Sequence, residues 1–271
     1  MKPPVALTVA GSDSGGGAGI QADLKTFAAL GVHGASALTA VTAQNTRGVS
    51  GYVQLPLDIV RAQIDDVVSD LAPAAVKTGM LASTEVIEVV STALQEHGMR
   101  RLVVDPVMVA KGGARLLRDD AIGALRDLLI PLAEVITPNL PEAEVLLGRE
   151  LRSRADRERA ARELVALGCR SVVVKGGHAE DDADDAFFVD GGRFLWLEGQ
   201  RIPTANTHGS GCAFSAAIAA GMAQGLPTEE AVRQAKEFIT GAIRHSLDVG
   251  HGHGPVNPMW RLPMWRLDQP A

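Results

Sequence analysis

The sequence predicts an α/β fold: a three-layer αβα sandwich with a mostly parallel central sheet and an antiparallel hairpin at one edge. Short, wholly apolar runs alternate with longer amphipathic segments along most of the chain, and such runs are typical of strands buried on both faces. Their repeated strand-then-helix order favours parallel strands joined by crossover helices. Late in the chain, two strand-like runs flank Asp190-Gly191-Gly192, which is typical of a hairpin turn.

The expected elements follow one another without an internal repeat or a linker. Strands are expected over residues 5–10, 35–41, 75–80, 102–107, 134–137 and 171–175, and in the hairpin over 186–189 and 193–197. Helices are expected over residues 21–30, 57–71, 84–97, 119–129, 156–167, 211–224 and 228–246. We therefore expect a single domain over residues 1–258, followed by a tail over 259–271. The tail belongs to no motif, and it is compatible with a packed segment, a subunit contact or disorder.

Composition restricts the classes of partner. The chain has 271 residues, a formal net charge of −6 and only 4% aromatic residues, so neither nucleic acid nor a membrane is expected as its partner. Its longest apolar stretch, over 213–223, is shorter than the roughly 18 residues of a membrane span. The start of the chain lacks the features of a signal peptide. Two cysteines, Cys169 and Cys212, provide no disulfide framework, and we expect a cytoplasmic protein that acts on small molecules.

A glycine-rich segment over 11–19 follows the first expected strand. It fails the dinucleotide-binding spacing because Ile20 stands where the last glycine belongs, and it fails the phosphate-loop spacing because Leu24 replaces the second glycine. Two interpretations remain open. The segment is either a flexible, amide-rich loop that faces a ligand at the end of a strand, or a tight connection between a strand and a helix.

A second glycine-rich turn, over 206–211, leads into a helix of small residues. The first N–H groups of a helix lack partners and its dipole is positive there, so this turn offers an anion hole suited to a phosphoryl group. Cys212 lies in that field, where a thiol should shift toward the thiolate and could act as a general base. A small buried packing residue is the alternative for Cys212, and it is the role that we assign to Cys169.

Three acidic or amide residues follow expected strands. Asp105 ends a buried strand, where a carboxylate can bind Mg²⁺ or orient a phosphate, although aspartate before proline is also a common turn former. Asn139 and Glu142 have the spacing of a helix capping box, which is favoured over metal coordination when the pair is considered alone. The acidic run over 180–185 is expected to be a solvated loop, and the histidines near 251–253 do not have the spacing of a zinc site.

Taken together, these motifs resemble the hydroxymethylpyrimidine/phosphomethylpyrimidine kinases of thiamine biosynthesis, in the ribokinase-like superfamily. The resemblance extends over nearly the whole chain and is carried by the segments 10–23, 42–46, 77–80, 104–108, 137–142, 175–178, 206–212 and 252–256. Each segment alone is weakly specific, but their number and order are characteristic. Ser210 stands where the family more often has threonine, a change with little expected effect because the loop would act through its backbone amides.

The resemblance implies the role of each site residue. It implies that Gly11, Asp23, Gln44, Met80 and Val107 hold a pyrimidine, with the Gln44 amide reading the ring nitrogen and the amino group. It implies that Asp105 and Glu142 organise Mg²⁺, with Asn139, Lys175 and Thr207 along ATP. It implies that Gly209, Ser210 and Gly211 form the anion hole and that Cys212 is the base.

The implied activity is phosphorylation of 4-amino-5-hydroxymethyl-2-methylpyrimidine by ATP, first to the monophosphate and then to the diphosphate. A homodimer is implied as well, and a monovalent-cation requirement is left open. Two other interpretations remain at this stage: a pyridoxal or pyridoxine kinase, and a catalytically silent protein that binds the pyrimidine.

Overall fold

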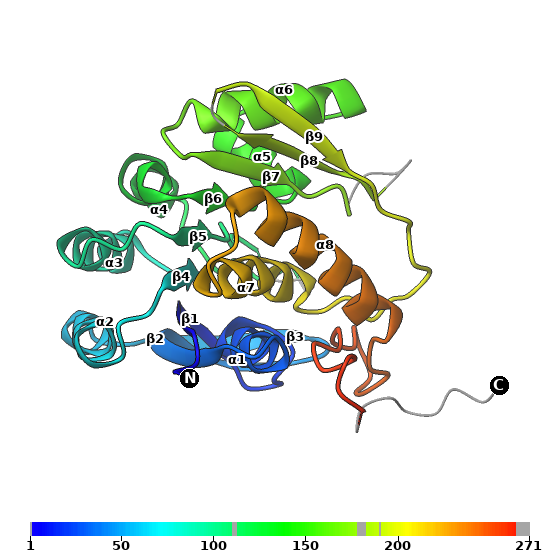
Figure 1. Ribbon diagram of the computed structural model, residues 1–271. Helices are drawn as coiled ribbons and strands as arrows, with labels where there is room; N and C mark the ends of the chain where they lie inside the picture. Colours follow the sequence, from blue (N-terminus) through cyan, green and yellow to red (C-terminus); the bar gives the residue numbers. More distant parts are fainter. Residues whose placement is uncertain (1, 110–112, 178–182, 190, 264–271) are drawn as a thin grey trace.

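One mixed sheet runs through the computed structural model, which describes residues 2–109, 113–177, 183–189 and 191–263. Its strands are β1 (Val5–Asp13), β2 (His33–Asn45), β3 (Gly48–Gln54), β4 (Ala75–Thr78), β5 (Leu102–Val104), β6 (Val135–Ile136), β7 (Ser171–Val174), β8 (Asp185–Val189) and β9 (Arg193–Leu197). Across the sheet they lie in the order β3-β2-β1-β4-β5-β6-β7-β8-β9 (Figure 1). The predicted α/β fold, in which helices alternate with the strands of one central sheet, is confirmed.

Helices join and cover the strands. They are α1 (Gly19–Ala29), α2 (Leu57–Leu71), α3 (Thr84–Glu96), α4 (Ala121–Ala124), α5 (Leu140–Leu147), α6 (Arg154–Val165), α7 (Ser210–Ala223) and α8 (Thr228–Arg244). The single helix expected over 119–129 is instead the short α4, followed by a π-helical turn over Leu125–Leu129 and a 3₁₀ turn over Ile130–Leu132. Pro131 in that last turn has no N–H to continue a helix.

Pairing of the strands is parallel from β2 through β1, β4, β5 and β6 to β7, as the sequence pattern predicts. The hairpin of β8 and β9 forms the predicted antiparallel edge. The other edge was not expected to be antiparallel: β2 continues to Asn45, and β3 returns beside it. The mostly exposed, glycine-containing β3 lacks the apolar run by which the other strands were predicted.

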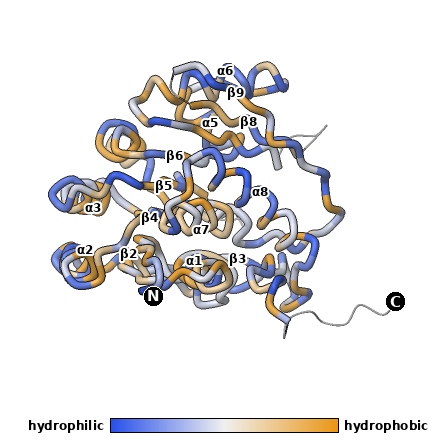
Figure 2. Tube along the Cα trace, viewed as in Figure 1, coloured by the Kyte–Doolittle hydropathy of each residue, from blue (hydrophilic) through white to orange (hydrophobic). Residues whose placement is uncertain are grey.

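Two hydrophobic layers enclose the sheet. Successive side chains along a strand point to opposite faces of the sheet. Leu7 therefore joins the layer under α2 to α6, whereas its neighbour Ala6 joins the layer under α1, α7 and α8. Figure 2 shows this as apolar helix faces turned toward the sheet and hydrophilic faces turned outward. The α7 helix is the exception, because its residues from Ala213 to Ala223 are all buried between the sheet and its neighbouring helices.

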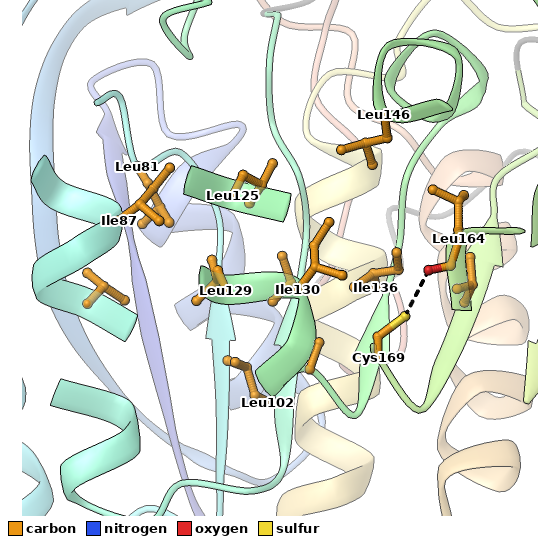
Figure 3. Close-up of a cluster of buried hydrophobic side chains, with 14 of the residues drawn as sticks. Leu81, Ile87, Leu102, Leu125, Leu129, Ile130, Ile136, Leu146, Leu164 and Cys169 are labelled. Carbon is orange, nitrogen blue, oxygen red and sulfur yellow. Dashed lines mark hydrogen bonds between the residues drawn. The ribbon is translucent and has the colours of Figure 1, made fainter. Parts of the chain in front are cut away.

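Cys169 is a packing residue, as predicted. Its side chain is 2% exposed, and its sulfur lies 3.6 Å from the Leu164 carbonyl oxygen, which accepts the thiol hydrogen (Figure 3). Around it are apolar side chains of the layer under α2 to α6, including Ile130 and Ile136.

The acidic run after β7 is not simply a solvated loop. Residues 180–182 and His178 lie outside the described part of the chain, but Asp184 and Asp185 are buried. Asp185 accepts the Gly176 N–H at 2.8 Å and binds the Lys236 ammonium at 2.8 Å. The expectation of solvation was wrong for these two carboxylates because they fasten the connection between β7 and β8.

The first part of the C-terminal tail packs on α8. The Trp260 ring stacks on His245, with 5.5 Å between ring centroids, and lies against Gly241, where a Cβ atom would be 2.2 Å from the ring. Trp265 lies outside the described residues. Within those residues, none of the helices combines the length and the apolarity required to cross a bilayer.

Gly241→Ala tests this packing. It should lower the free energy of unfolding by about 1–3 kcal/mol, because the added methyl group displaces the Trp260 ring. In a Trp260→Ala background the same change should be neutral, or stabilising by up to about 1 kcal/mol, since alanine favours helix more than glycine does. Urea unfolding of the four proteins forms a double-mutant cycle. Equal effects of Gly241→Ala in both backgrounds would contradict the contact.

Candidate functional site

The predicted site residues gather at the carboxyl edge of the sheet, around the point where the chain order reverses between β1 and β4. They lie on β1, on β2, in the segments that follow β4, β5, β6 and β7, and at the start of α7, a helix that packs against β1, β4 and β5 (Figure 1). These residues are Gly11, Gln44, Met80, Asp105, Val107, Asn139, Lys175 and Thr207 with Gly209 to Cys212. Open α/β sheets bind their ligands at this edge.

A cluster of charges lies at the ends of β5 and β7. The Lys175 ammonium is 3.0 Å from Asp105 Oδ1, which also accepts the Thr137 hydroxyl hydrogen at 3.2 Å. Burial opposes ionisation of Asp105, but the charges of Lys175 and Lys77 outweigh it and lower the pKa of this carboxyl. Asp105 is therefore an anion at neutral pH, and Lys175 is its cationic partner.

Glu142 lies beside this cluster at the start of α5. Its carboxylate accepts the Asn139 N–H at 2.8 Å, while the Asn139 side chain accepts the Glu142 N–H at 2.9 Å, so the predicted capping box is confirmed. Burial raises the pKa of Glu142 to about 7; Lys175 opposes this rise and the charge of Asp105 adds to it. A carboxyl of this kind is readily ionised when a cation approaches.

These two carboxyl groups fit a magnesium ion held jointly with a nucleotide. Mg²⁺ is usually bound by one or two carboxylates, with water and substrate phosphates completing its coordination. Asp105 and Glu142 supply such a pair, and a bound cation would offset the burial and the charge of Asp105 that raise the pKa of Glu142. Among the described residues, no three histidine, cysteine, aspartate or glutamate side chains form a metal cage by themselves.

The N-terminus of α7 forms the turn that the sequence predicts as an anion hole. Gly209 adopts φ of +76°, and a Cβ atom there would lie 1.8 Å from the Gly17 carbonyl oxygen, so only glycine fits. The Ser210 N–H donates to the Thr207 carbonyl oxygen at 3.2 Å and no side chain caps this helix, which leaves the next N–H groups, those of Gly211 and Cys212, for a ligand. A Cβ atom on Gly211 would lie 3.2 Å from Lys175 Nζ, so the turn faces the charged cluster.

Cys212, in the first turn of α7, does not have the lowered pKa that we expected. Burial raises the pKa of its thiol to about 11. The Lys77 charge and the Gly19 N–H favour the thiolate, but the carboxylates of Asp23 and Asp105 disfavour it. The expectation of a thiolate was wrong because the burial of the thiol and the two carboxylates outweigh the Lys77 charge and the Gly19 N–H.

Beneath this edge lies a fully buried ion pair. Lys77 Nζ is 2.8 Å from Asp23 Oδ2, and neither side chain is exposed. The Thr8 hydroxyl donates to the same oxygen at 2.6 Å, whereas no described group donates to Asp23 Oδ1. Asp23, predicted to bind substrate, thus lies below the other site residues. The sequence motifs assign no role to Lys77, although a lysine inside an apolar run is itself a signal of a buried, paired charge.

The first glycine-rich loop is organised around Asp13. This buried carboxylate accepts the N–H groups of Gly15, Gly17 and Ala18 at 2.8–3.0 Å and lies 2.9 Å from His208 Nε2. Burial alone would raise the pKa of Asp13, but these hydrogen bonds lower it. Of the two interpretations left open, the structure supports the tight connection, because the loop amides are already bound. Neither Asp13 nor His208 was predicted individually, since 195 positions separate them.

The remaining predicted residues line an apolar floor beside this loop. Met80 is 7% exposed and packs in a small cluster with Ala40, and Val107 packs against that cluster. A Cβ atom on Gly11 would lie 3.0 Å from the Met80 sulfur, so Gly11 and Met80 are in contact. The side chain of Gln44 reaches His208 at the rim of this floor.

Known proteins match the chain along most of its length. A family model described as phosphomethylpyrimidine kinase matches residues 13–257. A hydroxymethylpyrimidine/phosphomethylpyrimidine kinase of Bacillus subtilis strain 168 is 51% identical over 253 residues, 93% of both chains. A solved phosphomethylpyrimidine kinase of Clostridium difficile 630 aligns with a TM-score of 0.79 and 43% identity over 88% of this chain and 99% of that one. An ADP complex of Bacillus subtilis pyridoxal kinase aligns with a TM-score of 0.89 and 42% identity over 94% and 97%.

Glu142→Gln should change how stability depends on pH. The folded pKa of Glu142, about 7, exceeds its ordinary value, so between about pH 4.5 and 7 the unfolded chain releases this proton while the folded chain keeps it. The wild-type protein therefore loses stability over this range, by on the order of 2–3 kcal/mol. Glutamine keeps the capping acceptor without titrating. The free energy of unfolding of Glu142→Gln relative to that of the wild-type protein should therefore rise from pH 5 to pH 8.

Urea unfolding without metal or nucleotide measures this difference. The exposed Glu150, just beyond the same helix, gives the matched control Glu150→Gln, for which no such pH dependence is expected. A stability difference between Glu142→Gln and wild type that stays constant from pH 5 to pH 8 would contradict the buried-carboxyl interpretation.

Proposed function

Because the chain belongs to the phosphomethylpyrimidine kinase family, we propose that it phosphorylates 4-amino-5-hydroxymethyl-2-methylpyrimidine with ATP and then phosphorylates the monophosphate to the diphosphate. One observation carries this proposal. A planar amide on an apolar floor, the uncapped N-terminus of α7 with Cys212, and the pair of Lys175 and Asp105 all lie at one edge of the sheet. This is the set of groups that transfer of a phosphoryl group to a ring alcohol requires.

The pyrimidine ring would lie on the floor formed by Gly11, Met80 and Val107. Gln44 would pair with its edge, since an amide presents a donor and an acceptor in one plane. Asp23 would support this floor from below through its ion pair with Lys77.

The phosphates of ATP would lie between the charged cluster and α7. The N–H groups of Gly211 and Cys212 would bind the transferring group, with Gly209 and Ser210 shaping the turn. Lys175 would neutralise phosphate charge, and Asn139 and Thr207 would lie along the nucleotide. Asp105 and Glu142 would hold Mg²⁺, which when bound neutralises negative charge on the phosphates.

Cys212 would remove the proton of the hydroxymethyl group in the first transfer. Its pKa of about 11 means that the ligand-free protein holds it as the thiol at neutral pH, so the base role requires the thiolate in the substrate complex. In the second transfer the acceptor is a phosphate that is already ionised. A base then contributes less.

A pyridoxal kinase activity is the second candidate. The observation that favours it is the alignment of the ADP complex of a pyridoxal kinase over 94% of this chain with a TM-score of 0.89. Pyridoxal also carries a hydroxymethyl group on an aromatic ring. Pyridoxal has no amino group next to a ring nitrogen, which is the pair of atoms that the Gln44 amide would bind.

Two further properties stay predictions. A homodimer would cover the exposed apolar side chains of the β2 and β3 ribbon, which include Val41, Tyr52 and Val53. A reducing, cytoplasmic compartment would preserve the two free thiols, Cys169 and Cys212.

A competition assay tests the substrate. With limiting ATP and Mg²⁺, we expect the pyrimidine to be phosphorylated at least tenfold more efficiently than pyridoxal, because only the pyrimidine pairs with both polar atoms of Gln44. Phosphorus spectra of the products should show a monophosphate followed by a diphosphate. A preference for pyridoxal would support the second candidate, and binding of the pyrimidine without any product would indicate a silent binding protein.

Cys212→Ala should separate the two transfers. Loss of the base should reduce kcat for the hydroxymethyl acceptor by about 10²- to 10⁴-fold, and should reduce kcat for the monophosphate acceptor much less. In the wild-type protein, kcat of the first transfer should rise with pH below the pKa of Cys212, as the thiolate fraction grows. The matched control is Cys169→Ala, which removes the other thiol and should retain both activities. Equal losses on both acceptors in Cys212→Ala would refute the base role.

A further inference from the structure

The amide of Gln44 has two polar neighbours that determine its orientation. In the structure, its Nε2 atom faces His208 Nε2 at 3.4 Å, and its Oε1 atom faces the Thr42 hydroxyl at 3.1 Å. The oxygen and nitrogen of a glutamine amide have nearly the same size, so the hydrogen bonds around them decide which atom lies on which side.

His208 presents a hydrogen, not a lone pair. Asp13 is ionised, because its hydrogen bonds lower its pKa, and an ionised carboxylate only accepts. The 2.9 Å contact between Asp13 Oδ2 and His208 Nε2 therefore requires a hydrogen on Nε2. That single hydrogen is donated to Asp13, so toward Gln44, 3.4 Å away, the ring N–H offers no lone pair and only its partial positive charge. It cannot accept from the NH₂ group of Gln44, and its charge attracts the amide oxygen instead.

Thr42 presents a lone pair, not a hydrogen. Its hydroxyl lies 2.8 Å from the Ser12 carbonyl oxygen, which accepts its single hydrogen. Its oxygen therefore acts as an acceptor toward Gln44 and matches an NH₂ group better than a carbonyl oxygen. Both neighbours favour the amide turned by 180°, with the oxygen of Gln44 toward His208 and its NH₂ group toward Thr42.

His208 is held rigidly in this position. Its N–H donates to the Gly254 carbonyl oxygen at 3.0 Å, and its own carbonyl oxygen accepts the Val256 N–H at 3.0 Å. A Cβ atom on Gly17 would lie 2.4 Å from the imidazole ring, so the glycine-rich loop packs directly on it. The backbone of Gln44 is fixed in turn by the Ser14 hydroxyl, which contacts both its N–H and its carbonyl oxygen at 2.8 Å.

We infer that His208, oriented by Asp13, is a positioning residue that locks the Gln44 amide and makes the site select a 4-amino ring over a 4-oxo ring. This inference rests on the proposed pyrimidine kinase function. In the locked orientation, the oxygen of Gln44 accepts from the ring amino group, and its remaining N–H donates to the adjacent ring nitrogen. A 4-oxo ring with a protonated nitrogen offers the reverse pattern, and pairing with it would turn both Gln44 contacts into mismatches.

The experiment compares the 4-amino alcohol with 5-hydroxymethyl-2-methylpyrimidin-4-one as acceptors. His208→Leu removes the N–H group that contacts Asp13 and faces Gln44, whereas His208→Gln places an amide nitrogen near the position of Nε2 and restores that group. We expect the kcat/KM ratio of amino over oxo acceptor to be at least about a hundredfold in wild type, to fall at least about tenfold in His208→Leu and to stay within about threefold of wild type in His208→Gln.

Three results would overturn the inference: an unchanged ratio in His208→Leu, an equal loss of selectivity in both variants, or a wild-type protein that accepts both rings equally. In that last case the pyrimidine kinase function would stand. A wild-type protein that phosphorylates neither ring would reject the proposed function and the inference with it.

A measurement on the wild-type protein avoids dependence on the folding of the variants. The ¹⁵N spectrum of labelled histidine should show His208 protonated at Nε2, and His208→Leu assigns the signal by its absence. A wild-type protein with an unprotonated Nε2 would overturn the inference.

Discussion

Buried charge at the carboxyl edge of the sheet is the constraint on which the arrangement of the site depends. A charged side chain removed from water is tolerated only beside an opposite charge or several hydrogen bonds. Lys77 is paired with Asp23 and Lys175 with Asp105, so the ends of β4, β5 and β7 and the first turns of α1 are fixed relative to one another. The apolar layers stabilise the sheet, and these pairs determine where its polar edge can form.

The same burial explains why the site is preorganised and yet incomplete without ligands. Glu142 and Cys212 are held in positions where the protonated form is favoured, and both would ionise more easily once positive charge is added nearby. Asp13, in contrast, is satisfied entirely by the protein, through three backbone amides and one imidazole. The first glycine-rich loop therefore serves as a wall of the site, and α7 supplies the free amides.

Features that depend on neighbouring residues in the chain were predictable from the sequence. The apolar runs predicted the parallel strands, and Asp190-Gly191-Gly192 predicted the hairpin. The spacing of Asn139 and Glu142 predicted the capping box. Features that depend on distant packing were not. The β3 strand is mostly exposed and lacks an apolar pattern, and the pKa of Cys212 reflects its burial and the charges of Lys77, Asp23 and Asp105. The contact of Asp13 with His208 joins residues 195 positions apart, which no local pattern records.

Pairing of His208 with Pro255 has a consequence for the order in which the protein matures. The chain is synthesised from its N-terminus, and the sheet and α7 precede the segment over 250–257 by many residues. Until that segment leaves the ribosome, His208 lacks both of its main-chain partners, Gly254 and Val256. A nascent chain can thus bury much of its core while the wall around Gln44 is still unsupported, so ligand binding is expected to begin only after residues 250–257 have emerged and folded against His208.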